Sequence, residues 1–135
     1  MGHTHYHKFV RTPDAATFAA FAKDARKIIE ATDIPLADLL GEEGQPEITS
    51  NRVSFNGLGE DSYESFFMDS SETGFSFCKT NKKPYDEVVV AVLIAAKHHF
   101  GDNLELSTDA SAEEAADGLR LAKSVLGYGD FPCIP

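Results

Sequence analysis

Hydrophobic and polar residues alternate in some parts of this chain and follow a helical spacing in others. Residues 3–10 alternate, which predicts a strand with its three histidines on one face and Thr4, Tyr6 and Lys8 on the other. Residues 13–33 have the spacing of a helix that buries one stripe, and Pro13 suits its first position. Thr12 is its predicted cap. The predicted stripe consists of Phe18, Phe21, Ala22, Ala25, Ile28 and Ile29.

The middle of the chain predicts three or four further strands. Two β-rich pieces flank Ser50–Asn51 and form a predicted hairpin, and Asn56–Gly57 marks a second tight turn. In residues 74–80 the sequence GFSFCKT alternates again, with Phe75 and Phe77 on one face. We assign the phenylalanines to the core, which is the simplest interpretation of large apolar side chains.

The most apolar segment, residues 84–100, is predicted to be a helix, although its β-branched residues would also suit a strand. Asp86 and Glu87 complement the helix dipole at its start, and the basic residues 97–99 do so at its end. Gly101 supplies the C-terminal stop. Because the segment is apolar nearly all round, we expect it to be the most buried helix.

The remaining elements complete a single predicted domain, residues 1–135. Residues 103–109 suit a strand, and residues 111–127 suit a helix that opens with a capping box of Ser111 and Glu114. The order of elements predicts an α+β fold. We expect a mostly antiparallel sheet of four to five strands, with three helices packed mainly on one face.

The charge balance limits the partners of this domain. There are 22 acidic residues against 12 basic ones, a formal net charge of −10. Duplex nucleic acid and anionic membrane surfaces are therefore not expected partners. The run Val88–Ala96 is too short to span a membrane, and residues 1–10 lack the apolar region of a signal peptide. Cys78 and Cys133 do not form a disulfide framework, so we expect a cytoplasmic protein.

One short loop gathers positive charge in this acidic chain. Its lysines lie directly before the predicted helix of residues 84–100, and a helix N-terminus attracts anions. The candidate ligand-binding residues are Lys79, Thr80, Asn81, Lys82, Lys83 and Tyr85. A small anionic ligand, such as a nucleotide, would suit them. In the alternative interpretation, Asp86 and Glu87 satisfy the helix dipole and pair with the lysines. No P-loop or dinucleotide fingerprint is present, so we expect no cofactor.

The histidines are candidate metal ligands. His3 and His5 share a strand face and could bind a metal together with His98 or His99, if that helix end lies near the first strand. In the alternative interpretation, the later pair are favourable cations at a helix C-terminus, and the first strand is an exposed edge strand. Such an edge would allow a homodimer. Cys78 is interpreted as a buried strand cysteine rather than a nucleophile.

Six short motifs occur in the order GHTHY, FNG, FCKT, KPYD, KHH and GD. In this order they resemble a family of small uncharacterised proteins encoded by bacteriophages and prophages. The resemblance runs across nearly the whole chain, and FCKT followed by KPYD is its most specific part. It implies no catalytic residue, because the family has no assigned activity. It implies a context, namely a phage accessory protein in the cytoplasm of a bacterial host.

These observations leave three functions open. The first is a non-enzymatic module that binds a small anionic or phosphorylated ligand at the lysine loop. The second is an interaction module that contacts a host protein through its acidic surface. The third is a histidine- or metal-dependent phosphoesterase.

Overall fold

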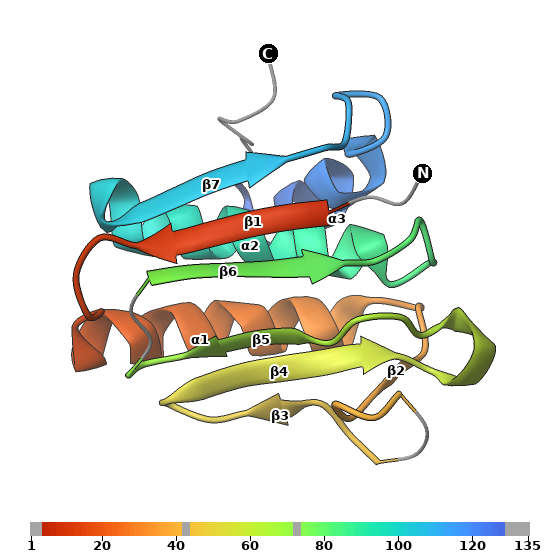
Figure 1. The fold of residues 1–135 in the computed structure, drawn as a ribbon, viewed down its shortest axis with the longest axis horizontal. Helices are drawn as coiled ribbons and strands as arrows, with labels where there is room; N and C mark the ends of the chain where they lie inside the picture. Colours follow the sequence, from red (N-terminus) through yellow and green to blue (C-terminus); the bar gives the residue numbers. More distant parts are fainter. Residues whose placement is uncertain (1–3, 42–43, 72–73, 129–135) are drawn as a thin grey trace.

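The computed structural model describes residues 4–41, 44–71 and 74–128. Its strands lie in one layer, and the three helices pack on one side of that layer (Figure 1). The predicted α+β fold with helices on one face is therefore confirmed. The strands differ from the prediction in two respects: the described residues contain seven strands rather than four to five, and these form two antiparallel sheets instead of one.

The first sheet contains the strand at the beginning of the chain. β1 (Thr4–Phe9) lies between β6 (Gly74–Lys79) and β7 (Leu104–Thr108), and both pairings are antiparallel. β1 is thus the central strand, and the prediction of an exposed edge strand was wrong. Both neighbours of β1 come from much later in the chain, so a local pattern does not reveal them. Because β1 has a neighbouring strand on each side, it has no free edge through which a homodimer could form.

The second sheet is built around β4 (Arg52–Gly57), which pairs with three short strands. These are β2 (Leu36–Ala37), β3 (Glu47–Ile48) and β5 (Phe66–Asp69). The hairpin predicted at Ser50–Asn51 is confirmed, since Thr49 N–H donates to the Arg52 carbonyl at 2.8 Å. The turn predicted at Asn56–Gly57 was wrong, because these residues end β4. The chain turns afterwards, at the 3-10 helix η1 (Gly59–Asp61).

The two sheets are joined at one end by Glu64. Its backbone N–H donates to the Lys79 carbonyl at 3.1 Å, and its side-chain Oε1 accepts from the Lys79 N–H at 2.7 Å. In a regular antiparallel pair the Glu64 carbonyl would take the second of these bonds. Here that carbonyl accepts from the Tyr85 hydroxyl at 2.5 Å instead. The Glu64 carboxylate therefore takes the place of the Glu64 carbonyl as the acceptor for the Lys79 N–H. As a result, β5 and β6 are not joined by a ladder of backbone hydrogen bonds.

The helices begin and end close to the predicted residues. α1 (Ala15–Ala31) is capped by Asp14, whose side chain accepts from the Thr17 N–H at 3.1 Å, so the predicted cap Thr12 was wrong. α2 (Asp86–Phe100) ends at Gly101, as predicted, and the 3-10 helix η2 (Gly101–Asn103) leads into β7. α3 (Ala116–Leu126) ends at Gly127.

The capping box predicted for the last helix forms. Ser111 N–H donates to the Glu114 carboxylate at 2.9 Å, and Glu114 N–H donates to the Ser111 hydroxyl at 3.1 Å. The α-helix itself begins only at Ala116, after a turn. The box therefore fixes the approach to α3.

The core lies between the helices and the inner faces of the sheets. α2 is its centre, with Val88, Leu93 and Ala96 among the buried side chains, as its apolar sequence predicts. α1 contributes the predicted stripe, of which Ile29 is only partly buried. Among the described residues, no helix is long and apolar enough to cross a membrane.

Candidate functional site

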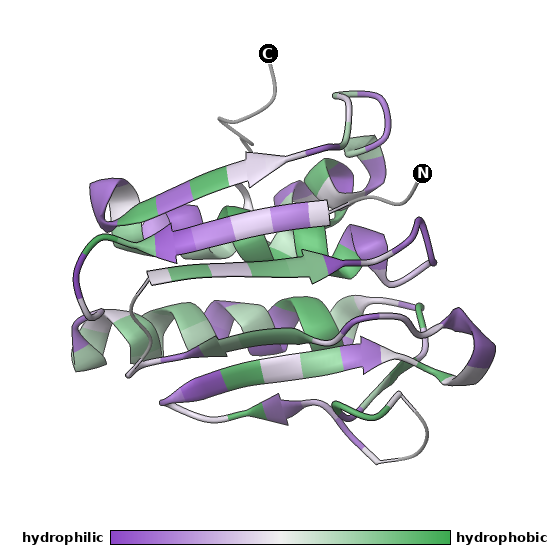
Figure 2. Ribbon diagram, viewed as in Figure 1, coloured by the Kyte–Doolittle hydropathy of each residue, from purple (hydrophilic) through white to green (hydrophobic). Residues whose placement is uncertain are grey.

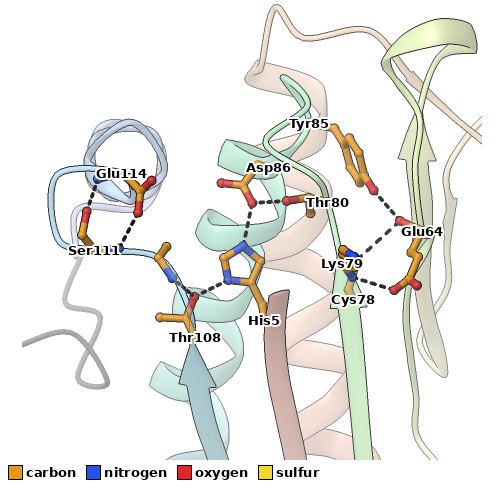
Figure 3. Close-up of polar contacts among 11 residues, drawn as sticks. His5, Glu64, Cys78, Lys79, Thr80, Tyr85, Asp86, Thr108, Ser111 and Glu114 are labelled. Atoms are coloured by element: carbon orange, nitrogen blue, oxygen red, sulfur yellow. Dashed lines mark hydrogen bonds and ion pairs between the residues drawn. The ribbon is translucent and has the colours of Figure 1, made fainter. Parts of the chain in front are cut away.

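A buried polar network lies where β1 meets the start of α2 (Figure 3). His5 Nε2 is 2.6 Å from Asp86 Oδ1, and its Nδ1 is 2.7 Å from the Thr108 hydroxyl. The Thr80 hydroxyl donates to the same Asp86 oxygen at 2.5 Å. His5 is only 1% exposed. The network thus connects β1, β6, β7 and α2 in the interior of the protein.

The hydrogen bonds assign the tautomer of His5. A carboxylate only accepts, so Nε2 carries the proton toward Asp86. In a neutral imidazole Nδ1 then accepts from the Thr108 hydroxyl, which itself accepts from the Ala110 N–H at 3.1 Å. The order carboxylate, imidazole, hydroxyl is that of a nucleophilic triad. Because His5 is buried and both its ring nitrogens are bonded within the protein, we interpret the arrangement as a structural connection.

A second buried group surrounds the Glu64 carbonyl, which accepts from the Tyr85 hydroxyl and from the Cys78 thiol, the latter at 3.5 Å. Burial raises the pKa of Cys78 to about 12, and the nearby carboxylates of Glu64 and Asp86 add to the effect. Burial likewise raises the pKa of Tyr85. Cys78 is therefore a protonated structural thiol, as the sequence indicates.

The lysine loop differs from the predicted anion site. Thr80 and Tyr85 are fully buried and bonded to Asp86 and Glu64, so their assignment to a ligand site was wrong. Asn81 and Lys82 are exposed, with φ of 53° and 60°. These left-handed conformations turn the chain between β6 and α2. The sequence predicts a loop here, and the assignment of the exposed Asn81 and Lys82 to a ligand site stays a prediction.

The cleft beside this loop is mainly acidic. Its volume is about 160 Å³. The titratable side chains that line it are Lys82, Lys83, Asp86, Glu87, Glu114 and Asp117. Lys82 pairs with Glu114 at 3.4 Å rather than with the helix-start acids predicted from the sequence. Burial and the charge of Asp117 raise the pKa of Glu87. Carboxylates outnumber lysines here, so this cleft repels an anionic ligand.

The structure does not bring the candidate metal ligands together. His5 lies at the start of α2, beside Asp86, whereas His98 and His99 lie at its end, about 18 Å away along the helix. His3 is outside the described residues. Within residues 4–41, 44–71 and 74–128, no group of three histidine, cysteine or acidic side chains could hold a metal ion.

The histidines at the end of α2 have structural partners instead. His99 Nε2 is 2.7 Å from Asp24 Oδ2, which also accepts from the Tyr128 hydroxyl at 2.7 Å. The His98 ring stacks on Tyr128, with centroids 3.8 Å apart. These contacts join the end of α2 to α1 and to Tyr128, two residues after the end of α3.

The side of the two sheets that faces away from the helices carries a different chemistry. We call this side the open face. On β6 its side chains include Phe75 and Phe77, which are 63% and 57% exposed. The apolar character of β6 is visible in Figure 2, where the strand lies in front of the helices and is largely green. The assignment of these two residues to the core was therefore wrong.

Tyr6 of β1 lies beside these phenylalanines. The Tyr6 and Phe75 rings stack with centroids 5.6 Å apart, and Phe75 and Phe77 are 6.3 Å apart. Lys8 is directly opposite Phe75 in the strand register, and Lys79 follows Phe77 by two residues on the same face. The three rings thus form one surface with a lysine near each end.

A shallow groove follows the β1 side of this surface. It has a volume of about 230 Å³ and is lined on the open face by Tyr6, Lys8, Phe75, Glu105 and Ser107. Flat apolar rings beside lysines can stack on a planar group and neutralise a nearby negative charge. Glu105 is directly opposite Lys8 in the strand register, so its carboxylate offsets part of the charge of that lysine, and Ser107 adds a hydroxyl to the rim.

Comparison with protein-family models, with curated proteins and with solved structures gave no match for this chain.

Proposed function

We propose that this protein is a non-enzymatic module that binds a nucleotide on the open face of the β6–β1–β7 sheet. One observation carries the proposal: Tyr6, Phe75 and Phe77 form a contiguous aromatic surface, and Lys8 and Lys79 flank it. The ligand class is the one that the sequence predicts. The site moves from the lysine loop to the strand before it, and Lys79 belongs to both.

The chemistry of the surface favours a ligand with a planar ring and a phosphate. Each base stacked on an aromatic side chain contributes about 1–3 kcal/mol to binding. Lys8 and Lys79 supply the positive charge that a phosphate requires. The acidic remainder of the chain weakens the long-range attraction of phosphates, so stacking provides most of the affinity.

Two alternatives from the sequence receive less support. No specific observation favours a host-protein interface on the acidic surface, and at the aromatic rings the adjoining lysines are a residue type depleted from the centre of protein interfaces. A phosphoesterase would need an accessible histidine beside other catalytic groups; His5 is buried, and the exposed His98 stacks on Tyr128. We propose the phage context on the resemblance of the sequence motifs alone.

Thermal unfolding with a panel of ribonucleoside and deoxyribonucleoside monophosphates tests the proposal. A ligand at about a hundred times its Kd stabilises the native state by about 2.7 kcal/mol, which raises the Tm measurably. Phe75→Ala and Phe77→Ala should abolish the shift, and Lys79→Ala should reduce it. Leu40→Ala is the matched control, because Leu40 is an exposed apolar residue away from these strands (77% exposed).

Variants in the lysine loop show which result would contradict the proposal. If Lys82→Ala and Lys83→Ala abolish the shift while Phe75→Ala leaves it intact, the ligand binds at the loop and the open-face site is wrong. If no nucleotide changes the Tm of the unaltered protein, the proposed function is wrong.

A further inference from the structure

The aromatic surface continues beyond the first sheet. Tyr63, just before β5, and Phe67, within β5, are both exposed. Tyr63 is held in place by Asn56 of β4, whose Nδ2 donates to the Tyr63 carbonyl at 2.9 Å and whose Oδ1 accepts from the Tyr63 N–H at 3.1 Å. The ring of Tyr63 is therefore presented by a fixed backbone.

A lysine bridges the boundary between the two sheets. The ammonium of Lys79, on β6, lies 5.9 Å from the centroid of the Tyr63 ring. Lys79 is also the residue whose backbone is bonded to Glu64. The open faces of the two sheets consequently form one surface at this point.

A second cation lies over the outermost ring. The Arg52 guanidinium carbon is 5.1 Å from the centroid of Phe67, and Arg52 Nε donates to Asp69 at 2.9 Å. That bond orients the guanidinium and leaves its other N–H donors for further contacts, one of them a long bond of 3.5 Å to Glu47. Aromatic rings and cations thus alternate across both sheets.

We propose that the occupant of this surface is a single-stranded nucleic acid of several nucleotides, an inference that rests on the proposed nucleotide-binding function. Neighbouring strands lie about 4.8 Å apart, so Tyr6 on β1 and Phe67 on β5 are separated by at least about 10 Å. One base cannot cover both rings. Successive bases of a single strand can stack on Tyr6, Phe75 and Phe77 in the first sheet and on Tyr63 and Phe67 in the second.

The surface distinguishes this occupant from two others. Bases in a duplex are already paired and stacked, so they cannot lie flat on exposed rings. A protein partner would meet Lys8 and Lys79 among the rings, although lysine is depleted from the centre of a protein interface. A single strand uses both features, because its bases stack on the rings while its phosphates contact the cations.

Fluorescence anisotropy with labelled oligothymidylate of about eight nucleotides, a size that one domain can cover, tests the inference. Thymidine monophosphate and a hairpin duplex are measured as competitors. We expect the oligonucleotide to bind more than about tenfold tighter than the monophosphate and the duplex. Two or three phosphate contacts predict a slope of log K against log salt of about −1.4 to −2.1.

The decisive variants lie in the second sheet. Phe67→Ala and Tyr63→Ala should weaken the oligonucleotide about fivefold or more and leave the monophosphate unchanged, whereas Phe77→Ala should weaken both. Ser124→Ala, on the exposed side of α3, should change neither. If the monophosphate binds but Phe67→Ala and Tyr63→Ala leave the oligonucleotide unaffected, the extended site is wrong and the nucleotide site stands. If neither probe binds, the proposed function fails with it.

Discussion

His5 Nε2 and Asp86 Oδ1 are 2.6 Å apart, and this contact joins the central strand of the first sheet to the first turn of the most buried helix. The two residues are 81 positions apart in the chain. Thr80 and Thr108 extend the contact to the strands on either side of β1. A single histidine therefore holds together one end of the domain.

Removal of this histidine should destabilise the protein strongly. His5→Ala leaves the Asp86 carboxylate buried without one of its hydrogen-bond donors, so we expect the free energy of unfolding to fall by about 3 kcal/mol. Urea denaturation measures this change. His98→Ala is the matched control, because His98 is exposed, and it should cost about 1 kcal/mol.

A double-mutant cycle separates this contact from general damage to the core. The loss of unfolding free energy in the double variant His5→Ala/Asp86→Ala should differ from the sum of the two single losses by more than about 1 kcal/mol. Additive losses would show that the 2.6 Å contact contributes nothing of its own.

Elements with strong local signals were predictable from the sequence. The proline, acidic residues, basic residues and Gly101 that border α2 outweigh the strand preference of its valines, and the helix lies where these signals place it. The alternation of β6 likewise predicts that Phe75 and Phe77 share a face. Both signals are local, and they determine local structure.

The remaining features depend on distant parts of the chain. Alternation divides the side chains of β6 between two sides of the strand but does not indicate which side packs against the helices. In the structure Ser76 and Cys78 point toward the helices, and the larger Phe75 and Phe77 point away from them. The central position of β1 follows from partners that no local pattern identifies. Residues of the lysine loop were assigned to a ligand because the acceptors of Thr80 and Tyr85 were not evident from the sequence.

Gly118 of α3 makes a close approach to α2. A Cβ atom at this position would lie 2.5 Å from the Cβ and Cγ1 atoms of Val90 and 2.9 Å from the Glu87 carbonyl. Helix propensity favours Gly118→Ala by about 1 kcal/mol, but forced overpacking costs about 1–3 kcal/mol. We therefore expect the Tm to fall. Ser124→Ala, on the exposed side of α3, should leave the Tm unchanged or raise it.

A compensating change tests the cause of this loss. Val90→Ala removes Cγ1, one of the two Val90 atoms that the new methyl group would meet, and keeps Cβ, so the double variant should recover part of the loss and be more stable than the sum of the two single losses implies. Without such recovery, the close approach of the two helices would not explain the effect.

Asp24 should contribute stability that depends on pH. Burial favours its neutral form, but hydrogen bonds from His99 and Tyr128, with the charges of His99 and Lys27, lower its pKa below the ordinary value of 3.8. Because the folded pKa is the lower one, the stabilisation is complete well above 3.8 and is lost as the pH falls through the folded value. Asp24→Asn should cost about 1–2 kcal/mol at neutral pH and much less in acid.

Urea denaturation across this pH range provides the measurement for Asp24. Asp102→Asn, at an exposed position, should change the free energy of unfolding by less than about 0.5 kcal/mol. A loss for Asp24→Asn that stays constant from neutral to acidic pH would contradict the ionic origin of the effect.

Cys78 should be chemically inert while the protein is folded. Its thiol is buried and contacts the Glu64 carbonyl, and its pKa is raised to about 12, so the reactive thiolate is scarce at neutral pH. In a Cys133→Ser variant, which leaves Cys78 as the single cysteine, iodoacetamide should label the unfolded chain in urea and not the native protein. Labelling of the native protein should follow the rate of unfolding and rise in His5→Ala, because that variant opens more often. Rapid labelling of the stable native state would show instead that this end of β6 is accessible, and that the junction between the two sheets at Glu64 is open in solution.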